Sequence, residues 1–230
     1  MQAKILSWNI WVDNHFEAVK DFLQKSDADI IGLQEVRGDD PSRDTVKFLA
    51  KLGFNYVFAP ITKSWDGEDW NFGPAIFTKH QIVTNNKFIL TVKEDSRSLA
   101  QADIKIGDRV VHVFCTHLTH THQKDSEIQL QQVNELLAYI PGRDSILMGD
   151  FNATPESKTI MKVKEVLVDT DTGNQPTWSV YPAGCPECNP QKIDTRLDYI
   201  FTTRDIKTNS YQVENSKGSD HLPVSVIAEL

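Results

Sequence analysis

The sequence has few cysteines and no long apolar run, and each absence narrows the class of protein. Its 230 residues include only 3 cysteines, whereas small disulfide-stabilised scaffolds are rich in them and an odd number cannot all pair. No stretch approaches the roughly 20 apolar residues of a membrane helix. Residues 1–9 show no basic flank followed by an apolar core, so no secretory signal is expected. The sequence therefore predicts a cytoplasmic protein without an integral membrane segment.

Basic residues are also scarce. The 24 Lys and Arg against 32 Asp and Glu give a net charge of −8, and no stretch is rich in Lys or Arg. This balance argues against strong electrostatic binding of a nucleic-acid duplex. It does not exclude a nuclease, because a bound divalent cation reverses the local sign of the charge. The 40% hydrophobic content is ordinary for a globular chain, and the length predicts one domain over residues 1–230, which we expect to be monomeric.

Short apolar runs alternate with amphipathic segments along the chain. Residues 3–8 and 145–148 are typical of buried strands. Ser126 followed by Gln129 has the spacing of a capping box and predicts the start of a helix that continues to residue 140. Pro155 predicts the first turn of another helix. Strands that alternate with helices indicate an α/β fold.

Polar side chains recur where these apolar runs end or begin. Strands of a packed sheet share a rim, so such side chains can meet in one cleft. The set is rich in hard oxygen ligands and contains no thiolate, which suits Mg²⁺ or Mn²⁺ better than structural zinc. The residues concerned are Asn9, Glu35, His117, Asp150, Asn152, Asp198, Asp220 and His221.

This set of side chains predicts hydrolysis of a phosphoester. A hard cation bound to Glu35 can polarise a phosphoryl oxygen, and Asp150 or His221 can orient or deprotonate the attacking water. No glycine-rich phosphate loop and no G-x-S-x-G elbow is present, which disfavours nucleoside-triphosphate chemistry of the loop type and acyl hydrolysis. Amide and imidazole groups can hold phosphate oxygens as charge develops, and the candidates are Asn9, Asn152 and His117.

At these residues the sequence resembles the endonuclease/exonuclease/phosphatase superfamily. That superfamily includes DNase I-like nucleases, abasic-site endonucleases, sphingomyelinases, inositol-polyphosphate phosphatases and deadenylases. Each motif is weak alone, but together they follow the family's order along nearly the whole chain. The motifs are Ser7-Trp8-Asn9, Leu33-Gln34-Glu35, Gly73 to Phe77, Arg97, Thr116-His117-Leu118, Gly149-Asp150-Phe151-Asn152, Leu197-Asp198-Tyr199-Ile200 and Ser219-Asp220-His221.

The resemblance implies a four-layer α/β sandwich, in which two facing mixed β-sheets of mostly antiparallel strands are flanked by helices, as in DNase I. It also implies that Mg²⁺, or Mn²⁺, is the cofactor and that a phosphoester is the substrate. By the same resemblance Glu35 is the principal metal ligand, assisted by Asn9 and Asp220.

The resemblance gives the catalytic positions as well. Asp150 positions or activates water, with Asn152 on the phosphate. His221 faces the scissile phosphate and is oriented by Asp198. Two further phosphate contacts are implied, His117 and Arg97.

One departure from the family bears on specificity. Some abasic-site endonucleases carry an acidic residue two positions after the Asn of the first motif, whereas here that position is Trp11 and Asp13 lies further on. This counts against a second metal site and that particular substrate. A phosphodiesterase or phosphomonoesterase is the leading interpretation, and a DNA-directed nuclease of the abasic-site or DNase I type is an alternative. A non-catalytic binding module is disfavoured because no central position is missing.

Two histidines and two cysteines are left without a role by these motifs. Cys185 and Cys188 form a single CxxC pair, and among cysteines only Cys115, in a predicted strand, remains to complete a closed zinc site. We therefore expect a local disulfide or a pair of free thiols. His120 and His122 alternate after the His117 motif, and we expect them to be loop residues near the mouth of the cleft.

The remaining candidates lie in loops or near opposite charges. Trp65 and Trp70, in a predicted loop, either grip the substrate or cover an edge of the core. A surface ion pair with Glu94 or Asp95 would also explain Arg97. We expect substrate choice to depend on residues 61–71, 119–125 and 171–193.

Overall fold

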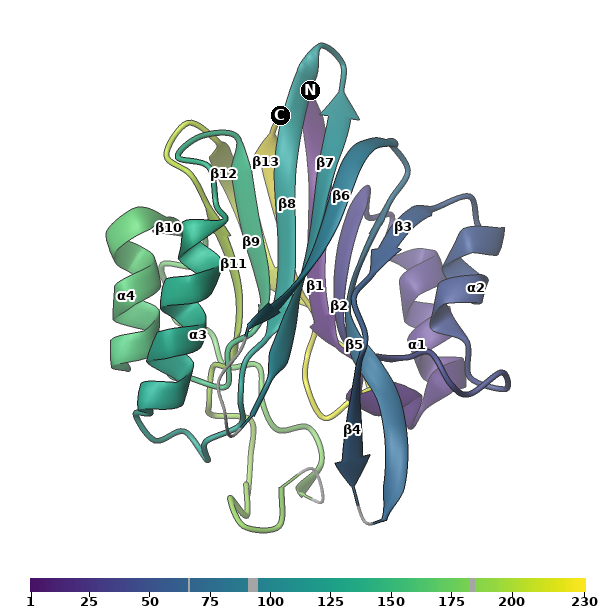
Figure 1. Cartoon of the computed structure of the whole chain (residues 1–230), viewed down its shortest axis with the longest axis vertical. Coiled ribbons are helices and arrows are strands. Elements are labelled where there is room, and N and C mark those ends of the chain that lie inside the picture. Colours follow the sequence, from purple (N-terminus) through teal and green to yellow (C-terminus); the bar gives the residue numbers. More distant parts are fainter. Residues whose placement is uncertain (66, 91–94, 183–184) are drawn as a thin grey trace.

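Two β-sheets pack face to face and carry helices on their outer faces, as a computed structural model of the chain shows (Figure 1). The structure describes residues 1–65, 67–90, 95–182 and 185–230. In the described part of the chain the two sheets have seven and six strands. The fold expected from the sequence, a four-layer α/β sandwich of the DNase I-like type, is therefore confirmed.

Both sheets are mixed, with one parallel pair each: β1 with β2, and β8 with β9. In spatial order the first sheet contains β12 (Lys207–Val213), β13 (Val224–Glu229), β1 (Gln2–Asn9), β2 (Ile30–Arg37), β5 (Glu68–Thr78) and β3 (Asn55–Phe58), and β4 (Ile61–Trp65) pairs with β5. The second sheet contains β10 (Val168–Asp169), β11 (Asp198–Thr202), β9 (Ser145–Asp150), β8 (Arg109–His117), β7 (Arg97–Ile106) and β6 (Gln81–Leu90).

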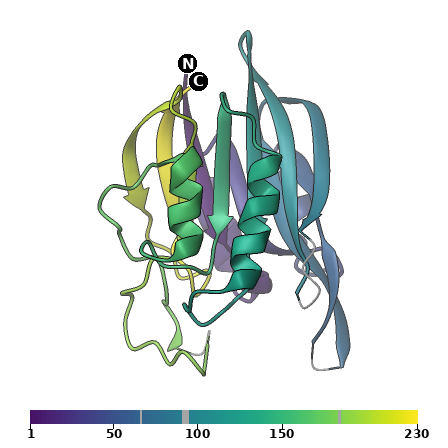
Figure 2. The same ribbon diagram turned by 60° about the vertical axis from the view of Figure 1, so that its left-hand side comes forward.

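The helices form the two outer layers. Helices α1 (Phe16–Lys25) and α2 (Thr45–Lys51) cover the first sheet, and α3 (Glu127–Ala138) and α4 (Lys158–Val166) cover the second (Figure 1). Figure 2 shows α3 and α4 side by side in front of the second sheet. A short 3₁₀ helix, Trp11–Asp13, follows β1. Among the helices in the described ranges, none is long and apolar enough to cross a membrane.

Three buried clusters hold the four layers together. Neighbouring strand residues point to opposite faces, so Ile5 packs between the two sheets whereas Leu6 packs under α1 and α2. In the second sheet Ile146 packs between the sheets and Leu147 packs under α3 and α4. Because both faces of each sheet are covered, these central strands are apolar without alternation. They therefore appear in the sequence as short continuous apolar runs.

The start of α3 differs in one respect from the expected capping box. The Ser126 hydroxyl accepts a hydrogen bond from the backbone N–H of Ile128, as expected of an N-cap. The Gln129 side chain does not return to Ser126, so that half of the prediction is wrong. Its Nε2 donates instead to the backbone oxygens of Thr119, Phe151 and Asn152. At this buried junction, hydrogen bonds to the three backbone oxygens take priority over the local cap at Ser126.

Helix α4 begins later in the chain than the sequence predicts. The helix begins at Lys158 rather than near Pro155, because the Ser157 hydroxyl caps it by accepting from the N–H of Ile160. Residues 151–157 therefore form a turn between β9 and α4. This turn contains Asn152, one of the predicted site residues, whose backbone has a left-handed φ of 49°.

Candidate active site

The strand register brings the predicted site residues to one rim of the sandwich. In the second sheet, Asp150 at the end of β9 is paired with His117 at the end of β8 and with Asp198 at the start of β11. In the first sheet, β1 ends at Asn9, next to the part of β2 that carries Glu35. Residues far apart in sequence thus meet because their strands end at the same level.

Asn9 connects the two sheets across this rim. Its Nδ2 donates to Glu35 Oε1 at 3.2 Å and to Asp150 Oδ2 at 3.0 Å. Its Oδ1 accepts from the backbone N–H of Trp11 at 3.0 Å, which fixes the orientation of the amide. Asn9 therefore holds two carboxylates of opposite sheets within reach of one ligand.

Glu35 occupies an irregular position of β2. Its φ is 59°, and the pairing of β2 with β5 shifts register between Leu33 and Val36. A bulge of this kind re-aims a side chain, and a left-handed φ in a residue other than glycine stores backbone strain. The Glu35 side chain keeps 21% of its surface exposed, so its carboxylate faces an opening at the rim.

Carboxylates crowd this opening. Burial raises the pKa of Glu35 to about 7, and the charge of Asp220 adds to the shift. Burial also raises the pKa of Asp150 to about 6, although the charge of His221 opposes the shift. A bound cation relieves such crowding, because it favours the ionised form of every carboxylate around it.

His221 is held by a carboxylate on its far side. Its Nδ1 donates to Asp198 Oδ2 at 2.8 Å, and the Thr177 hydroxyl donates to the same oxygen at 2.6 Å. The Nε2 lies 3.6 Å from Asp150 Oδ2. Burial lowers the pKa of His221, but the charges of Asp198, Asp150 and Asp220 outweigh burial and raise it well above its usual value. The three carboxylates therefore favour the imidazolium form of this side chain.

His117 is the opposite case, a neutral imidazole. Burial lowers its pKa well below the usual value, and the charge of Arg97 contributes in the same direction. The Asn152 Nδ2 donates to His117 Nε2 at 2.9 Å and to the backbone oxygen of Leu118 at 3.1 Å. The backbone N–H of Asn152 donates to Asp150 Oδ1 at 2.8 Å. One imidazolium and one imidazole thus flank Asp150.

Arg97, at the start of β7, forms the ion pair that the sequence offered as its alternative explanation. Its Nη2 lies 3.1 Å from Asp95 Oδ2, and Lys63 contacts the same carboxylate. Glu94 lies outside the described residues. The charge of Arg97 nevertheless contributes to the lowered pKa of His117. Its phosphate contact remains a prediction.

Asp220 is held by two side chains at the rim. Its Oδ2 accepts from the indole N–H of Trp178 at 3.1 Å, and its Oδ1 accepts from the Ser219 hydroxyl at 3.3 Å. Sequence reasoning missed both Trp178 and the Thr177 that supports Asp198. The two lie in a segment without periodicity, and no local signal marks them.

The departure at Trp11 removes an acidic group from the rim. The Trp11 ring stacks on Tyr181 with centroids 5.7 Å apart. Asp13 is buried and its Oδ1 accepts from the hydroxyl of Thr45 in α2 at 2.7 Å. Asp13 thus contacts α2 and does not replace the missing carboxylate.

Trp65 and Trp70 lie on paired strands rather than in the expected loop. Trp65 ends β4 and is paired with Glu68, and Trp70 lies on β5 opposite Lys63. The prediction failed because the polar residues of this hairpin resemble a loop composition. The guanidinium of Arg37 lies 4.2 Å from the centre of the Trp70 ring. The Trp65 side chain lies outside the described part of the structure.

Two groups of potential metal ligands occur in the described residues. One comprises Asp150, Asp198 and His221, and the other comprises His120, His122, Cys185 and Cys188. The Cys185–Cys188 pair is bonded as a disulfide, one of the two expected states. No pattern in the sequence links the two histidines to the cysteines, whereas the fold places all four together. His120 also touches the rim, since its Nδ1 lies 2.8 Å from Asn152 Oδ1.

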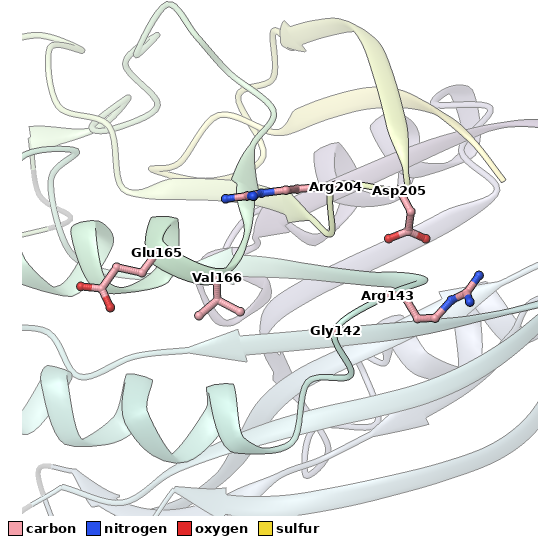
Figure 3. A pocket seen from close by; sticks show the side chains of 6 residues that line it. All are labelled: Gly142, Arg143, Glu165, Val166, Arg204 and Asp205. Atoms are coloured by element: carbon pink, nitrogen blue, oxygen red, sulfur yellow. The ribbon is translucent and has the colours of Figure 1, made fainter.

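A surface pocket lies at the opposite end of β9 and β11 from this rim. Its residues come from the segment before β9, the end of α4 and the segment after β11, and three of its four charged groups have partners: Arg143 pairs with Asp144, Asp205 with Arg109 and Glu165 with Lys162. It is therefore not a candidate for the chemistry. The pocket is lined by Gly142, Arg143, Glu165, Val166, Arg204 and Asp205 (Figure 3).

Several solved structures share this fold. An endonuclease/exonuclease/phosphatase from Beutenbergia cavernae DSM 12333 superimposes with a TM-score of 0.77 at 20% identity, covering 100% of this chain and 72% of that chain. The mannosyl-6-phosphatase Bt3783 of Bacteroides thetaiotaomicron VPI-5482 gives 0.74 at 18% identity, with 99% and 100% covered. ANGEL2, a 2',3'-cyclic phosphatase, gives 0.72 at 15% identity, with 99% and 95% covered.

These likenesses establish the fold, and the family is established by sequence. No curated protein matches the chain. The model of the Endonuclease/Exonuclease/phosphatase family matches residues 6–221, which spans every motif from Asn9 to His221. The reaction class expected from the sequence, hydrolysis of phosphoric esters, is thereby confirmed at the level of the family. The chain belongs to the Endonuclease/Exonuclease/phosphatase family.

Proposed function

We propose that the chain hydrolyses phosphodiester or phosphomonoester bonds with the help of Mg²⁺. The observation that carries this proposal is the bridge from Asn9 to both Glu35 and Asp150. It places carboxylates of two sheets around one opening, with an imidazolium, His221, next to them. Water attack on phosphorus requires these elements together.

The donor set fits a hard cation. Glu35 and Asp220 would hold it through oxygen atoms, which Mg²⁺ and Mn²⁺ prefer. Asn9 would join them only with its amide turned over, because its Nδ2 faces the carboxylates and its Oδ1 accepts from Trp11. The raised pKa of Glu35, to about 7, supports this assignment. Burial and the charge of Asp220 disfavour the ionised carboxylate, and a bound cation would stabilise that form. When bound, the cation polarises a phosphoryl oxygen and neutralises charge.

Asp150 and His221 divide the remaining chemistry. Both oxygens of Asp150 accept hydrogen bonds, from Asn9 and from the backbone of Asn152, so the carboxylate is fixed in place to orient the attacking water and take its proton. His221 is kept charged by Asp198 and would donate to an oxygen of the scissile phosphate as negative charge develops. The other ring, His117, is neutral and can accept or donate at the same phosphate.

The charge of the chain favours a small or lipid phosphoester over duplex DNA. A net charge of −8 opposes tight duplex binding, and Asp13 is turned toward α2. Two proteins of similar fold carry the names mannosyl-6-phosphatase and 2',3'-cyclic phosphatase, so sugar phosphates and cyclic phosphates belong in a substrate panel. Abasic and single-stranded DNA, RNA, sphingomyelin and inositol phosphates complete that panel.

The test uses the whole chain with bis(p-nitrophenyl) phosphate and p-nitrophenyl phosphate. We expect hydrolysis with Mg²⁺ or Mn²⁺, none with a chelator, and a loss of about 10²-fold or more in kcat for Glu35→Gln and for His221→Asn. Glu165→Gln, which removes an exposed carboxylate of α4 paired with Lys162, is the matched control. Activity that survives chelation, or that both site variants retain, contradicts the proposal. Binding of Mn²⁺ without turnover of any panel member would favour the non-catalytic alternative.

A further inference from the structure

We propose that the reduced chain binds one Zn²⁺ through His120, His122, Cys185 and Cys188. These four side chains form a Cys₂His₂ site beside the rim, separate from the oxygen ligands proposed for Mg²⁺. Two loops supply the ligands: the segment after β8 carries the histidines, and the long segment between β10 and β11 carries the cysteines. Metal binding at these residues does not depend on the proposed function.

The distances that involve a histidine nitrogen are close to those of a tetrahedral site. Tetrahedral zinc with Zn–S and Zn–N bonds of about 2.3 and 2.05 Å separates nitrogen from sulfur by about 3.6 Å, and the two nitrogens by about 3.3 Å. Here Nε2 of His120 lies 3.8 and 3.6 Å from the two sulfurs. Nδ1 of His122 lies 3.7 and 3.3 Å from the same sulfurs, and the two nitrogens are 3.1 Å apart. A single ion can therefore contact all four atoms after a small separation of the sulfurs.

The hydrogen bonds on the far side of each ring determine which nitrogen is free. Nδ1 of His120 faces the amide oxygen of Asn152 at 2.8 Å, and Nε2 of His122 faces the carboxylate of Glu187 at 3.1 Å. Both acceptors require a proton on the ring nitrogen that faces them. When both rings are neutral, the two inner nitrogens then carry lone pairs that point at each other, 3.1 Å apart, which is unfavourable without a cation or a shared proton between them. Metal-bound histidines have this arrangement, with the outer N–H held by an oxygen acceptor.

The backbone around the cysteines supports thiolates in the same place. The N–H of Cys188 donates to Sγ of Cys185 at 3.1 Å, and the N–H of Asn189 donates to the backbone oxygen of Cys185 at 3.0 Å. The turn therefore presents both sulfurs to the histidines and stabilises negative charge on the first. The expectation of no zinc site rests on Cys115 as the third cysteine, which is buried in β8 beside Gln34. The missing ligands are histidines, not cysteine.

The disulfide and the zinc site are two states of the same residues. A dithiol converts the Cys185–Cys188 bond to two thiols, supplying two electrons and two protons and becoming a disulfide itself. Binding of Zn²⁺ then releases both thiol protons to solvent. When zinc is bound, the ion links the segment that carries Thr177 and Trp178 to the loop after β8. It would therefore hold in place the two side chains that donate to Asp198 and Asp220.

The test measures metal content rather than activity. The whole chain is reduced with a dithiol, desalted without oxygen, and loaded with Zn²⁺ or Co²⁺ in the presence of excess Mg²⁺. We expect one equivalent of zinc by elemental analysis, and with Co²⁺ the visible bands of a tetrahedral site together with a thiolate-to-cobalt charge-transfer band. Zinc should also raise the Tm of the reduced chain.

Substitutions identify the ligands. Cys188→Ser and His122→Ala should lose the bound zinc and the charge-transfer band, whereas His122→Cys should retain zinc because it supplies another ligand. His80→Ala removes a histidine outside the cluster and should keep one equivalent. Glu35→Gln should also keep it, so a failure of this proposal is distinguishable from a failure of the proposed hydrolysis. Absence of zinc from the reduced wild-type chain, or its retention by both Cys188→Ser and His122→Ala, overturns the proposal.

Discussion

Replacing Asp198 with Asn tests the proposed role of His221 most directly. Asp198 is fully buried and receives the Nδ1–H of His221 at 2.8 Å. The substitution keeps the shape of the side chain and removes its charge. Two carboxylates remain near the ring, Asp150 and Asp220, so His221 should still protonate, but less readily.

The size of the effect follows from the charge that this hydrogen bond loses, because the oxygen of an Asn side chain can still accept it. A hydrogen bond to a charged partner in a buried site stabilises by about 1.5–3 kcal/mol, and about 1.4 kcal/mol corresponds to one pKa unit. The pKa of His221 in Asp198→Asn should therefore fall by about 1–2 units from its raised value. Because the protonated ring is the active form in our proposal, activity disappears as the pH rises through this pKa. The alkaline limb of the pH profile should move to lower pH by the same 1–2 units.

The assay is kcat/KM for bis(p-nitrophenyl) phosphate with saturating Mg²⁺, measured from about pH 6 to about pH 10. Asp205→Asn is the matched control, because it makes the same change at a carboxylate that pairs with Arg109 on the surface, and its profile should coincide with that of the wild type. An alkaline limb that stays in place in Asp198→Asn would refute the reasoning, even if the rate fell. A uniform loss would mean that Asp198 only orients the ring.

Two other substitutions test the buried structure next to the site, at Asp13 and at Gly149. Burial raises the pKa of Asp13 to about 7, so the folded chain binds this proton more tightly than the unfolded chain and loses up to roughly 4 kcal/mol of stability between about pH 4 and pH 7. Asp13→Asn should therefore be more stable than the wild type at about pH 8 and equal to it near pH 4 in urea unfolding, and a gap that does not change with pH contradicts this. At Gly149, with φ of 153°, a Cβ would lie 2.1 Å from the backbone oxygen of Thr116, so Gly149→Ala should displace β8 from β9 next to Asp150, destabilise the fold by about 1–3 kcal/mol and reduce activity. Gly107→Ala is its control, since nothing lies near that position, and equal effects of the two changes on activity would argue against a displaced Asp150.

The rim itself was predictable because it depends on patterns that are local in sequence. Short apolar runs such as residues 145–148 indicate strands covered on both faces, and the polar residue that ends each run marks the rim. Asp150 and His117 pair directly for this reason. The ordered motifs of the family then supplied the four-layer arrangement, which apolar patterning alone does not specify.

The failures occur where tertiary contacts outweigh local preference. Gln129 has the right spacing to cap α3, but its amide donates to a backbone oxygen in the loop after β8 and to two in the turn after β9. Unpaired backbone oxygens at that buried junction would cost more than a surface cap contributes. Thr177 and Trp178 were missed for a related reason. They lie in a loop without periodicity, and their partners, Asp198 at the start of β11 and Asp220, lie 21 and 42 residues further along the chain.

The conformation of Glu35 links strain to function more closely than any pattern in the sequence. A continuous β2 would place residue 35 in alternation with its neighbours, with its backbone in the extended region. Instead the strand bulges and Glu35 adopts a φ of 59°, at a cost of about 1–3 kcal/mol. Its carboxylate accepts a hydrogen bond from Asn9 at 3.2 Å, lies 3.8 Å from Nδ1 of His117 and sits in a site where Asp220 raises its pKa. Neither contact offsets the strain and the crowding, whereas a bound cation would offset both, so the backbone of β2 and the charges at the rim point independently to the same ligand.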